Sequence, residues 1–168
     1  MKASITLIPR PLTMNIKDGV CSDDKKLIRK IDDGLDEDEY RLSIDPEGIC
    51  IFAKEEKGFF YAEKTLQQLR YQYPEEIPCM EIEDKPQYPY RSFHIDTSRH
   101  YFSVNELKRM IEAASAFKFN VFHWHFSDDQ GYRLESKVFP LLHEIGAKRK
   151  GDHFGNYRSD EEEHLYYT

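Results

Sequence analysis

The pattern of apolar and polar positions in the first half of the chain predicts strands mixed with helices. Residues 3–12 read as a short strand stopped by proline. Residues 22–35 read as a polar helix with a glycine near its end. Two alternating runs flank a Pro-Glu-Gly turn over residues 39–54, and this arrangement predicts a β-hairpin.

A helix and a strand complete this first part. Residues 77–84 read as a strand. Residues 57–73 predict a helix with one apolar face made of Phe59, Ala62, Leu66 and Leu69. We therefore predict a small α+β domain over residues 1–88.

The segment DKPQYPYR separates this part from a second pattern near residues 84–90, because proline favours extended backbone at the residue before it. Beyond it, residues 91–96 read as a strand, residues 103–119 as a helix and residues 120–126 as a second strand. Strand, helix and strand make a βαβ unit. We expect its two strands to be parallel and both largely buried.

The helix expected over residues 103–119 has a defined start and one apolar face. Ser103 and Glu106 fit the S-x-x-E capping box. The apolar stripe consists of Leu107, Met110, Ile111, Ala114 and Phe117.

Polar side chains gather where each of the two strands ends. The first strand is followed by Asp96, Ser98, Arg99 and His100, and the second by Ser127, Asp128, Asp129 and Gln130. Parallel βα units carry their chemistry at the carboxyl ends of the strands. We therefore expect a functional site at this edge, and we predict that the side chains of Arg99 and Asp128 approach each other there.

Charge and hydropathy narrow the class of protein. A formal net charge of −7 disfavours a nucleic-acid-binding protein, which would usually carry a basic face. No apolar run approaches the roughly 20 residues of a membrane helix. The first residues, MKASITLIPRPL, lack the apolar stretch of a signal peptide. Both a cytoplasmic protein and the mature form of an exported one fit, so the compartment stays open.

Each polar cluster also has a purely structural interpretation. His123 and His125 form an H-x-H pair on one side of a strand, as in some metal sites, but strand histidines held by hydrogen bonds are the interpretation that we favour. Asp128 and Asp129 fit a turn cap as well as a functional role. Arg99 fits a structural ion pair as well as a contact to a substrate hydroxyl. We predict no metal and no other cofactor.

The segment from YPYRSFHIDTSRHYF to NVFHWHFSDDQGYR, residues 88–133, resembles the opening of the catalytic barrel of the family 20 glycoside hydrolases, the β-N-acetylhexosaminidases. Their usual pattern is a strand ending in D-x-S-R-H-F/Y-F, a helix, and then N-x-x-H-x-H-L-x-D-D-Q-G-W-R. The segments LIPRP and GFFYAEKTLQQL resemble their small α+β domain. The resemblance implies an α+β domain over residues 1–88, then the first βαβ portion of a TIM barrel, a partial (β/α) barrel, over residues 89–168.

The resemblance also implies roles for matching positions. Arg99 matches the arginine that grips ring hydroxyls of the terminal sugar. Asp128 matches the aspartate that supports the active site, and Asp129 and His125 are further supporting residues. Neither histidine of the H-x-H pair is a metal ligand in the family. Tyr132 stands where tryptophan is common. The implied activity is hydrolysis of terminal β-linked N-acetylhexosamine residues, without a metal.

By the same resemblance, the catalytic acid pair lies outside this sequence. In substrate-assisted retaining catalysis the acetamido oxygen attacks the anomeric carbon, an aspartate orients it, and an adjacent glutamate protonates the leaving oxygen. That Asp-Glu pair follows the fourth strand of a barrel of roughly 250 residues, so we expect it beyond residue 168. Asp160 and Glu161 follow no apolar strand and are not assigned to this role. We expect an N-terminal fragment that is inactive alone.

Two other functions stay open. One is a non-catalytic binding or assembly module, because the strands of an unclosed barrel leave sheet edges that seek a partner. Self-association, a partner chain or poor order over residues 135–168 would then follow. The other is an H-x-H metal-dependent hydrolase. The expected partners are glycans that contain N-acetylhexosamine, with no nucleic acid and no membrane.

Overall fold

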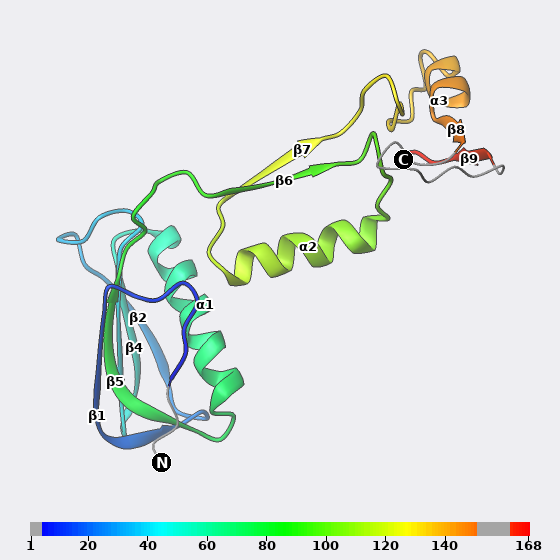
Figure 1. Ribbon diagram of the computed structural model, residues 1–168. Coiled ribbons are helices and arrows are strands. Elements are labelled where there is room, and N and C mark those ends of the chain that lie inside the picture. The colour runs from blue at the N-terminus through cyan, green and yellow to red at the C-terminus, as the bar shows by residue number, and fades with distance from the viewer. Residues whose placement is uncertain (1–4, 151–161) are drawn as a thin grey trace. The chain divides into compact units, whose positions relative to one another are not determined.

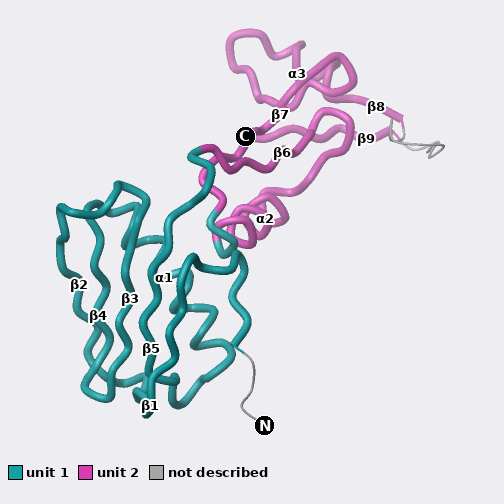
Figure 2. The backbone as a smooth tube through the Cα atoms, turned by 60° about the vertical axis from the view of Figure 1, so that its left-hand side comes forward, with its two compact units in different colours: residues 1–89, 116–118 teal, residues 90–115, 119–168 magenta. Residues whose placement is uncertain are grey.

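The computed structural model describes residues 5–150 and 162–168, and the chain forms two compact units (Figures 1 and 2). Unit 1 comprises residues 1–89 and 116–118, and unit 2 comprises residues 90–115 and 119–168. Within the described ranges, no helix is both long enough and apolar enough to cross a membrane.

Unit 1 is a five-stranded sheet with one helix along a face (Figure 1). The strand order is β1-β5-β3-β4-β2, and the neighbours are antiparallel except for the parallel pair β2 and β4. The elements are β1 (Thr13–Ser22), β2 (Leu27–Ile31), β3 (Tyr40–Asp45), β4 (Gly48–Ala53), α1 (Glu56–Gln72) and β5 (Glu76–Asp84).

The predicted hairpin, the first helix and the strand after it are confirmed. β3 and β4 pair in antiparallel register up to Asp45 and Gly48, on either side of the expected turn. The predicted helical face, Phe59, Ala62, Leu66 and Leu69, is buried. It packs with sheet residues that include Leu42, Ile44, Ile49, Ile51 and Ile82. Burial of this many apolar side chains is the main source of stability for such a domain.

The strand predicted over residues 3–12 is wrong for the described residues 5–12, which precede β1 and do not join the sheet. Their backbone bonds to the first helix instead. The N–H groups of Thr6 and Ile8 donate to Oε1 of Gln72 and Gln68, at 3.0 and 2.9 Å. Side-chain amides of α1 therefore satisfy the backbone groups that a strand partner would otherwise have taken.

The polar helix predicted over residues 22–35 is also wrong, because this segment contains the edge strand β2. Residues 27–31 pair in parallel with residues 49–53 of β4. Arg29 reaches across to α1, where its guanidinium donates to Glu63 and Glu56. The polar side chains fit an exposed edge strand, and pairing with a distant strand overrides the local preference.

A buried ion pair lies inside unit 1. Lys118, which follows α2 (Val104–Ala116), donates from Nζ to Asp84 Oδ2 at 2.7 Å and to the hydroxyl of Tyr40 at 2.9 Å. The Tyr40 hydroxyl also lies 2.6 Å from Thr65 Oγ1. Burial, together with the nearby charge of Asp84, raises the pKa of Tyr40. The backbone of Lys118 has a φ of 62°, in the left-handed region that L residues adopt at a cost.

Unit 2 contains the predicted βαβ arrangement. Its elements are β6 (Ser92–Asp96), α2, β7 (Val121–His125), α3 (Leu141–Gly146), β8 (Lys148–Lys150) and β9 (Glu162–His164). β6 and β7 are parallel neighbours joined through α2, as predicted (Figure 1). The capping box is confirmed, because the N–H of Ser103 donates to Glu106 Oε2 and the N–H of Glu106 donates to Ser103 Oγ.

The expectation that β6 and β7 are largely buried is wrong. Among their residues only Ile95 is buried, whereas His94 and His123 are exposed. One face of the pair packs with Leu107 of α2 and with Tyr167. The other face carries the histidines, and no described element covers it. The α2 stripe is only partly buried as well: Ile111 is 41% exposed.

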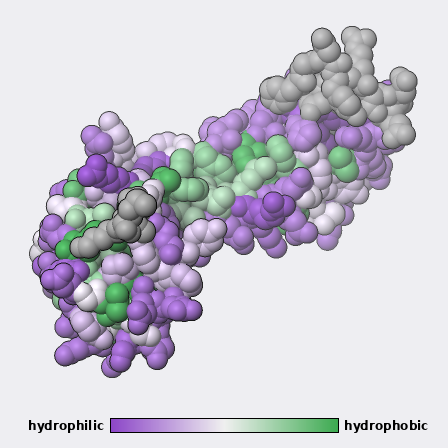
Figure 3. All heavy atoms as spheres, turned by 60° about the horizontal axis from the view of Figure 1, so that its bottom comes forward, coloured by the Kyte–Doolittle hydropathy of each residue, from purple (hydrophilic) through white to green (hydrophobic). Residues whose placement is uncertain are grey.

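The described residues after β7 form short elements that the sequence did not predict. β8 and β9 pair in antiparallel register, and Leu134 bridges to Tyr167. Apolar side chains on and before α3 remain exposed: Val138, Phe139, Leu141, Leu142 and Ile145. In the space-filling view, green apolar residues interrupt the purple polar surface (Figure 3).

Candidate functional site

The ends of β6 and β7 lie side by side. Asp96, the last residue of β6, is the Cα partner of His125, the last residue of β7. The strands are parallel, so the loops that leave them start from the same edge. The first loop carries Arg99 and the second carries Asp128.

Arg99 lies at the centre of this edge. Its Nη1 is 2.9 Å from Asp128 Oδ2 and donates to Asp96 Oδ2 at 3.0 Å. The same nitrogen lies 2.8 Å from His125 Nε2. The predicted approach of Arg99 and Asp128 is thus confirmed. We call Asp96, Arg99, His125 and Asp128 the Arg99 cluster.

His125 links the two sides of the cluster. Its Nε2 lies 2.9 Å from Asp128 Oδ2 as well as 2.8 Å from Arg99 Nη1. A ring nitrogen accepts when it is bare and donates when it is protonated. A bare His125 Nε2 therefore accepts from Arg99, whereas a protonated Nε2 donates to Asp128.

The two carboxyl groups of the cluster favour the charged form. Burial acts to raise the pKa of Asp96, but N–H donors from Arg99 and Ser98 and the charge of Arg99 outweigh it, so this pKa lies below the ordinary value. The N–H of Asp129 and the His125 ring lower the pKa of Asp128, with help from the Arg99 charge. Two anionic carboxylates thus hold one guanidinium at neutral pH.

Other predicted site residues lie outside this contact set. Asp129 donates its backbone N–H to Asp128 Oδ1 at 2.8 Å. Within the part of the chain that the structure describes, its carboxylate has no hydrogen bond or ion pair. Asp160 and Glu161 lie outside the described residues.

Three imidazoles share the open face of β6 and β7. The His94 and His123 rings meet edge to face at 4.7 Å between centroids, and the His94 and His125 rings are 6.1 Å apart. Across residues 5–150 and 162–168, no group of three or more histidine, cysteine, aspartate or glutamate side chains is arranged to hold a metal ion.

Sequence reasoning missed the residues that hold the first loop. Thr97 donates from Oγ1 to the carbonyl of Phe126 and accepts from Trp124 Nε1, each at 2.9 Å. Arg133 and Arg149 donate to carbonyl groups of the same loop. Arg133 closes the D-D-Q-G-Y-R sequence, so its place in that pattern was a signal that could have identified it.

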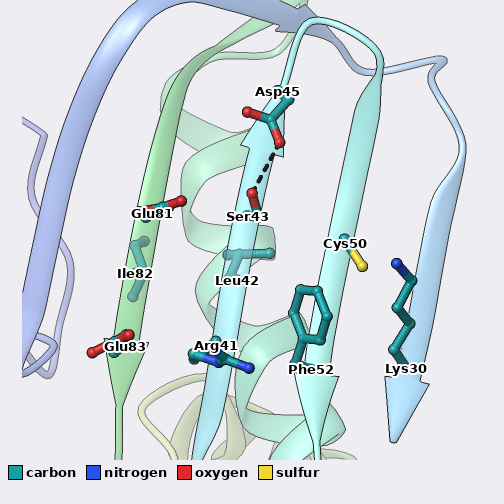
Figure 4. Close-up of a pocket in the computed structure, with 10 residues that line it drawn as sticks. All are labelled: Lys30, Arg41, Leu42, Ser43, Asp45, Cys50, Phe52, Glu81, Ile82 and Glu83. Atoms are coloured by element: carbon teal, nitrogen blue, oxygen red, sulfur yellow. Dashed lines mark hydrogen bonds between the residues drawn. The ribbon is translucent and has the colours of Figure 1, made fainter. Parts of the chain in front are cut away.

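A hollow of about 400 Å³ lies on the outer sheet face of unit 1 (Figure 4). Several of its polar side chains already bond to, or lie against, other side chains of unit 1. Ser43 Oγ donates to Asp45 Oδ2 at 2.9 Å, and Arg41 forms an ion pair with Asp32. The cationic groups of Lys30 and Arg41 lie over the Phe52 ring. We therefore place the candidate site at the Arg99 cluster.

Two family models match the chain. The model described as glycosyl hydrolase family 20, domain 2, matches residues 5–85, and the model described as glycosyl hydrolase family 20, catalytic domain, matches residues 88–168. Together the two matches cover the chain except for its first residues and a short connection.

Curated relatives carry consistent names. A beta-hexosaminidase of Porphyromonas gingivalis is 39% identical over 128 residues, which are 70% of this chain and 16% of that protein. A beta-hexosaminidase of Akkermansia muciniphila is 33% identical over 168 residues, which cover 95% of this chain and 34% of the relative. The chain thus spans about a third or less of the length of these relatives.

Solved structures give the same result. The crystal structure of a beta-N-acetylhexosaminidase superposes with a TM-score of 0.85 at 32% identity, over 99% of this chain and 35% of that one. A family 20 exo beta-N-acetylglucosaminidase from Vibrio harveyi, solved in complex with N-acetylglucosamine, gives a TM-score of 0.80 at 29% identity. That match covers 95% of this chain and 33% of the other.

Proposed function

The chain belongs to glycosyl hydrolase family 20, and we propose that it supplies part of the sugar-binding site of a hydrolase that removes terminal β-linked N-acetylhexosamine residues. Residues 89–168 form the first βαβ portion of a TIM barrel in this proposal. The substrates are glycans that end in N-acetylhexosamine.

The observation that carries the proposal is the setting of Arg99. Within the described residues, the side-chain contacts of Arg99 are made through Nη1, with Asp96, Asp128 and His125. Nε and Nη2 remain as donors. A guanidinium presents its donors in a rigid planar fork, which suits two neighbouring hydroxyl groups of a sugar ring.

The carboxylates of the Arg99 cluster preorganise this fork. Asp96 and Asp128 approach it from the ends of different strands, so the guanidinium is oriented before a sugar arrives. A donor fixed in advance loses little freedom on binding, and positioning of this kind contributes several kcal/mol to catalysis. Asp128 and His125 are supporting residues in this proposal, and Asp129 supports through its N–H contact to Asp128.

The reaction itself is substrate-assisted retaining hydrolysis, with the acetamido oxygen of the sugar as nucleophile. The orienting aspartate and the proton-donating glutamate are contributed from outside the 168 residues. The chain alone therefore has no hexosaminidase activity. General acid–base help contributes about 10²- to 10⁴-fold, and the chain by itself lacks that group.

The test compares the 168-residue chain with the protein expressed from its complete reading frame, using an aryl N-acetylglucosaminide. We expect no turnover by the chain and turnover by the complete protein. In the complete protein, Arg99→Ala should raise KM and lower kcat/KM, because the lost hydrogen bonds serve both the bound sugar and the transition state.

The control is Arg109→Ala, which removes an exposed arginine of α2 and should leave both constants unchanged. Turnover by the 168-residue chain that disappears in Glu161→Gln would contradict the assignment of the catalytic pair. Unchanged KM and kcat/KM in Arg99→Ala would contradict the role of Arg99.

A second candidate function is a non-catalytic assembly module. It is favoured by the exposed apolar residues on and before α3, which surround a hollow of about 600 Å³. Exposed apolar patches often mark contact sites. A reading frame that stops at codon 168, together with a concentration-dependent sedimentation coefficient, would support this function over hydrolysis.

A further inference from the structure

Arg133 is fully buried, which is rare for an arginine. Its donors bond to backbone carbonyl oxygens. Nε donates to the carbonyl of Thr97 at 2.8 Å, Nη2 to that of Ser98 at 3.1 Å, and Nη1 to that of Leu165 at 2.7 Å. Two of these three carbonyls belong to the loop between β6 and Arg99.

Arg149 holds the same loop through a second guanidinium. Its Nη1 donates to the carbonyls of Ser98 at 2.7 Å and Arg99 at 2.8 Å. The consecutive carbonyls of residues 97, 98 and 99 are therefore all bound by arginine, and that of Ser98 is bound by both.

The local sequence makes room for this contact. A side chain at Gly131 would place its Cβ 2.8 Å from the guanidinium carbon of Arg133, closer than real Cβ contacts come. The N–H of Arg133 donates to Ser127 Oγ at 2.8 Å, and the Arg133 guanidinium lies over the Tyr101 ring. A side chain at position 131 would thus have to displace the Arg133 guanidinium, which glycine leaves in place.

The arrangement has an electrostatic cost. Burial lowers the pKa of Arg133, and the charge of Arg149 lowers it further. Two like charges beside one loop oppose each other, and the oriented carbonyl dipoles of the loop offset part of this repulsion. A hydrophobic side chain would avoid the charge but could not donate to these carbonyl oxygens, which suggests that the arginines serve the geometry of the loop.

We propose that Arg133 and Arg149 are positioning residues for Arg99. They fix the backbone from Thr97 to Arg99, so that the Arg99 guanidinium stays between Asp96, the last residue of β6, and Asp128, in the loop after β7. This inference rests on the proposed function, in which Arg99 contacts the sugar.

The first test uses the 168-residue chain. Arg149→Gln removes one of the two guanidinium groups while Arg133 remains in place. We expect faster amide hydrogen exchange at Ser98 and Arg99, whose N–H groups donate to Asp96 Oδ1. The exposed Lys108→Gln on α2 is the control and should change neither rate. Unchanged exchange in Arg149→Gln would overturn the proposal.

The second test uses the protein from the complete reading frame and a thermodynamic cycle. Arg149→Gln should raise KM roughly tenfold in the presence of Arg99, as expected for a displaced charged hydrogen bond. In the Arg99→Ala background the same change should have little further effect on KM, because the two substitutions act through one group. Arg149→Lys keeps the positive charge, so its KM should lie between that of Arg149→Gln and that of the unchanged protein.

The outcomes distinguish the positioning role of Arg133 and Arg149 from the proposed role of Arg99 in sugar binding. A fully additive effect of Arg149→Gln on KM in the Arg99→Ala background would mean that Arg149 supports only the fold, and would overturn the inference while leaving the proposed function intact. An unchanged KM in Arg99→Ala alone would overturn both. Gly131→Ala gives an independent variant, because it displaces the Arg133 guanidinium without removing a charge, and it should follow Arg149→Gln in both tests.

Discussion

The ion pair between Lys118 and Asp84 and the pair between Arg99 and Asp128 have similar lengths, 2.7 and 2.9 Å, but different surroundings. In unit 1 the side chains of Lys118 and Asp84 are 7% and 11% exposed, and a tyrosine hydroxyl completes the group. In unit 2 the side chains of Arg99 and Asp128 are 27% and 35% exposed. The first pair is enclosed by protein. In the second pair, Nε and Nη2 of Arg99 remain as donors within the described residues.

The buried cores of the two units also differ. The core of unit 1 contains a large cluster of buried apolar residues between sheet and helix. The buried cluster of unit 2 consists of Ile95, Leu107 and Tyr167, with partly buried aromatics around it. Apolar burial stabilises unit 1, whereas in unit 2 the buried Arg133 and the half-buried Arg149 bind the loop after β6 through backbone carbonyls. The Lys118 ion pair is therefore enclosed in unit 1, whereas the Arg99 pair of unit 2 stays partly exposed.

The largest expected effect is on the stability of unit 1. Lys118→Met leaves Asp84 buried without its cation, and breaking such a pair typically costs about 3–5 kcal/mol. Urea unfolding followed by circular dichroism measures this loss. Lys17→Met, which breaks an exposed pair with Glu81, is the matched control and should leave the midpoint unchanged. Equal midpoints for the two variants would contradict the claim that the buried pair stabilises unit 1 more than the exposed pair does.

The next effect concerns the exposed apolar residues of unit 2. We expect the 168-residue chain to self-associate at micromolar concentration, because Phe139 and Ile145 are 66% and 65% exposed. Replacing both by serine should weaken association by about a hundredfold or more, since burial of each side chain is worth about 1.5–3 kcal/mol and every 1.4 kcal/mol is tenfold. Sedimentation velocity over a concentration series measures it. A compact monomer in the unchanged chain would refute this prediction.

A smaller effect follows from the lowered pKa values of Asp96 and Asp128. Each has a folded pKa below its ordinary value of 3.8, so its stabilising contribution is complete above that pH and is lost as pH falls through the lower, folded pKa. The protection of the Ser98 amide against hydrogen exchange, relative to the intrinsic rate at each pH, should therefore fall as the pH drops below about 3.8. Asp96→Asn should show low protection at all pH values, and protection that does not change with pH in the unchanged chain would argue against the cluster.

The smallest expected effect is that of Arg99→Ala on stability. We expect the free energy of unfolding of the chain, measured in urea, to change by no more than about 0.5 kcal/mol, because the side chain is partly exposed and lies outside both cores. The same substitution should raise KM in the complete protein. A stability loss as large as that of Lys118→Met would assign Arg99 a structural role instead.

Much of the fold follows from local pattern in the sequence. The alternating runs around Pro46 predict the hairpin, the face that begins at Phe59 predicts α1, and Ser103 with Glu106 predicts the start of α2. In each case the determining interactions join residues that are close along the chain. The sequence likewise placed Arg99 and Asp128 at the ends of two strands, from which their contact follows.

The tertiary structure decided what depends on distant partners. Residues 27–31 look helical by themselves and become a strand only because β4 offers a parallel edge. Arg133 looks like an exposed loop residue, yet its guanidinium binds the carbonyl of Thr97, 36 residues earlier. Sequence patterns report local periodicity and capping, whereas strand pairing and the satisfaction of a buried charge depend on groups that only folding brings within hydrogen-bond distance.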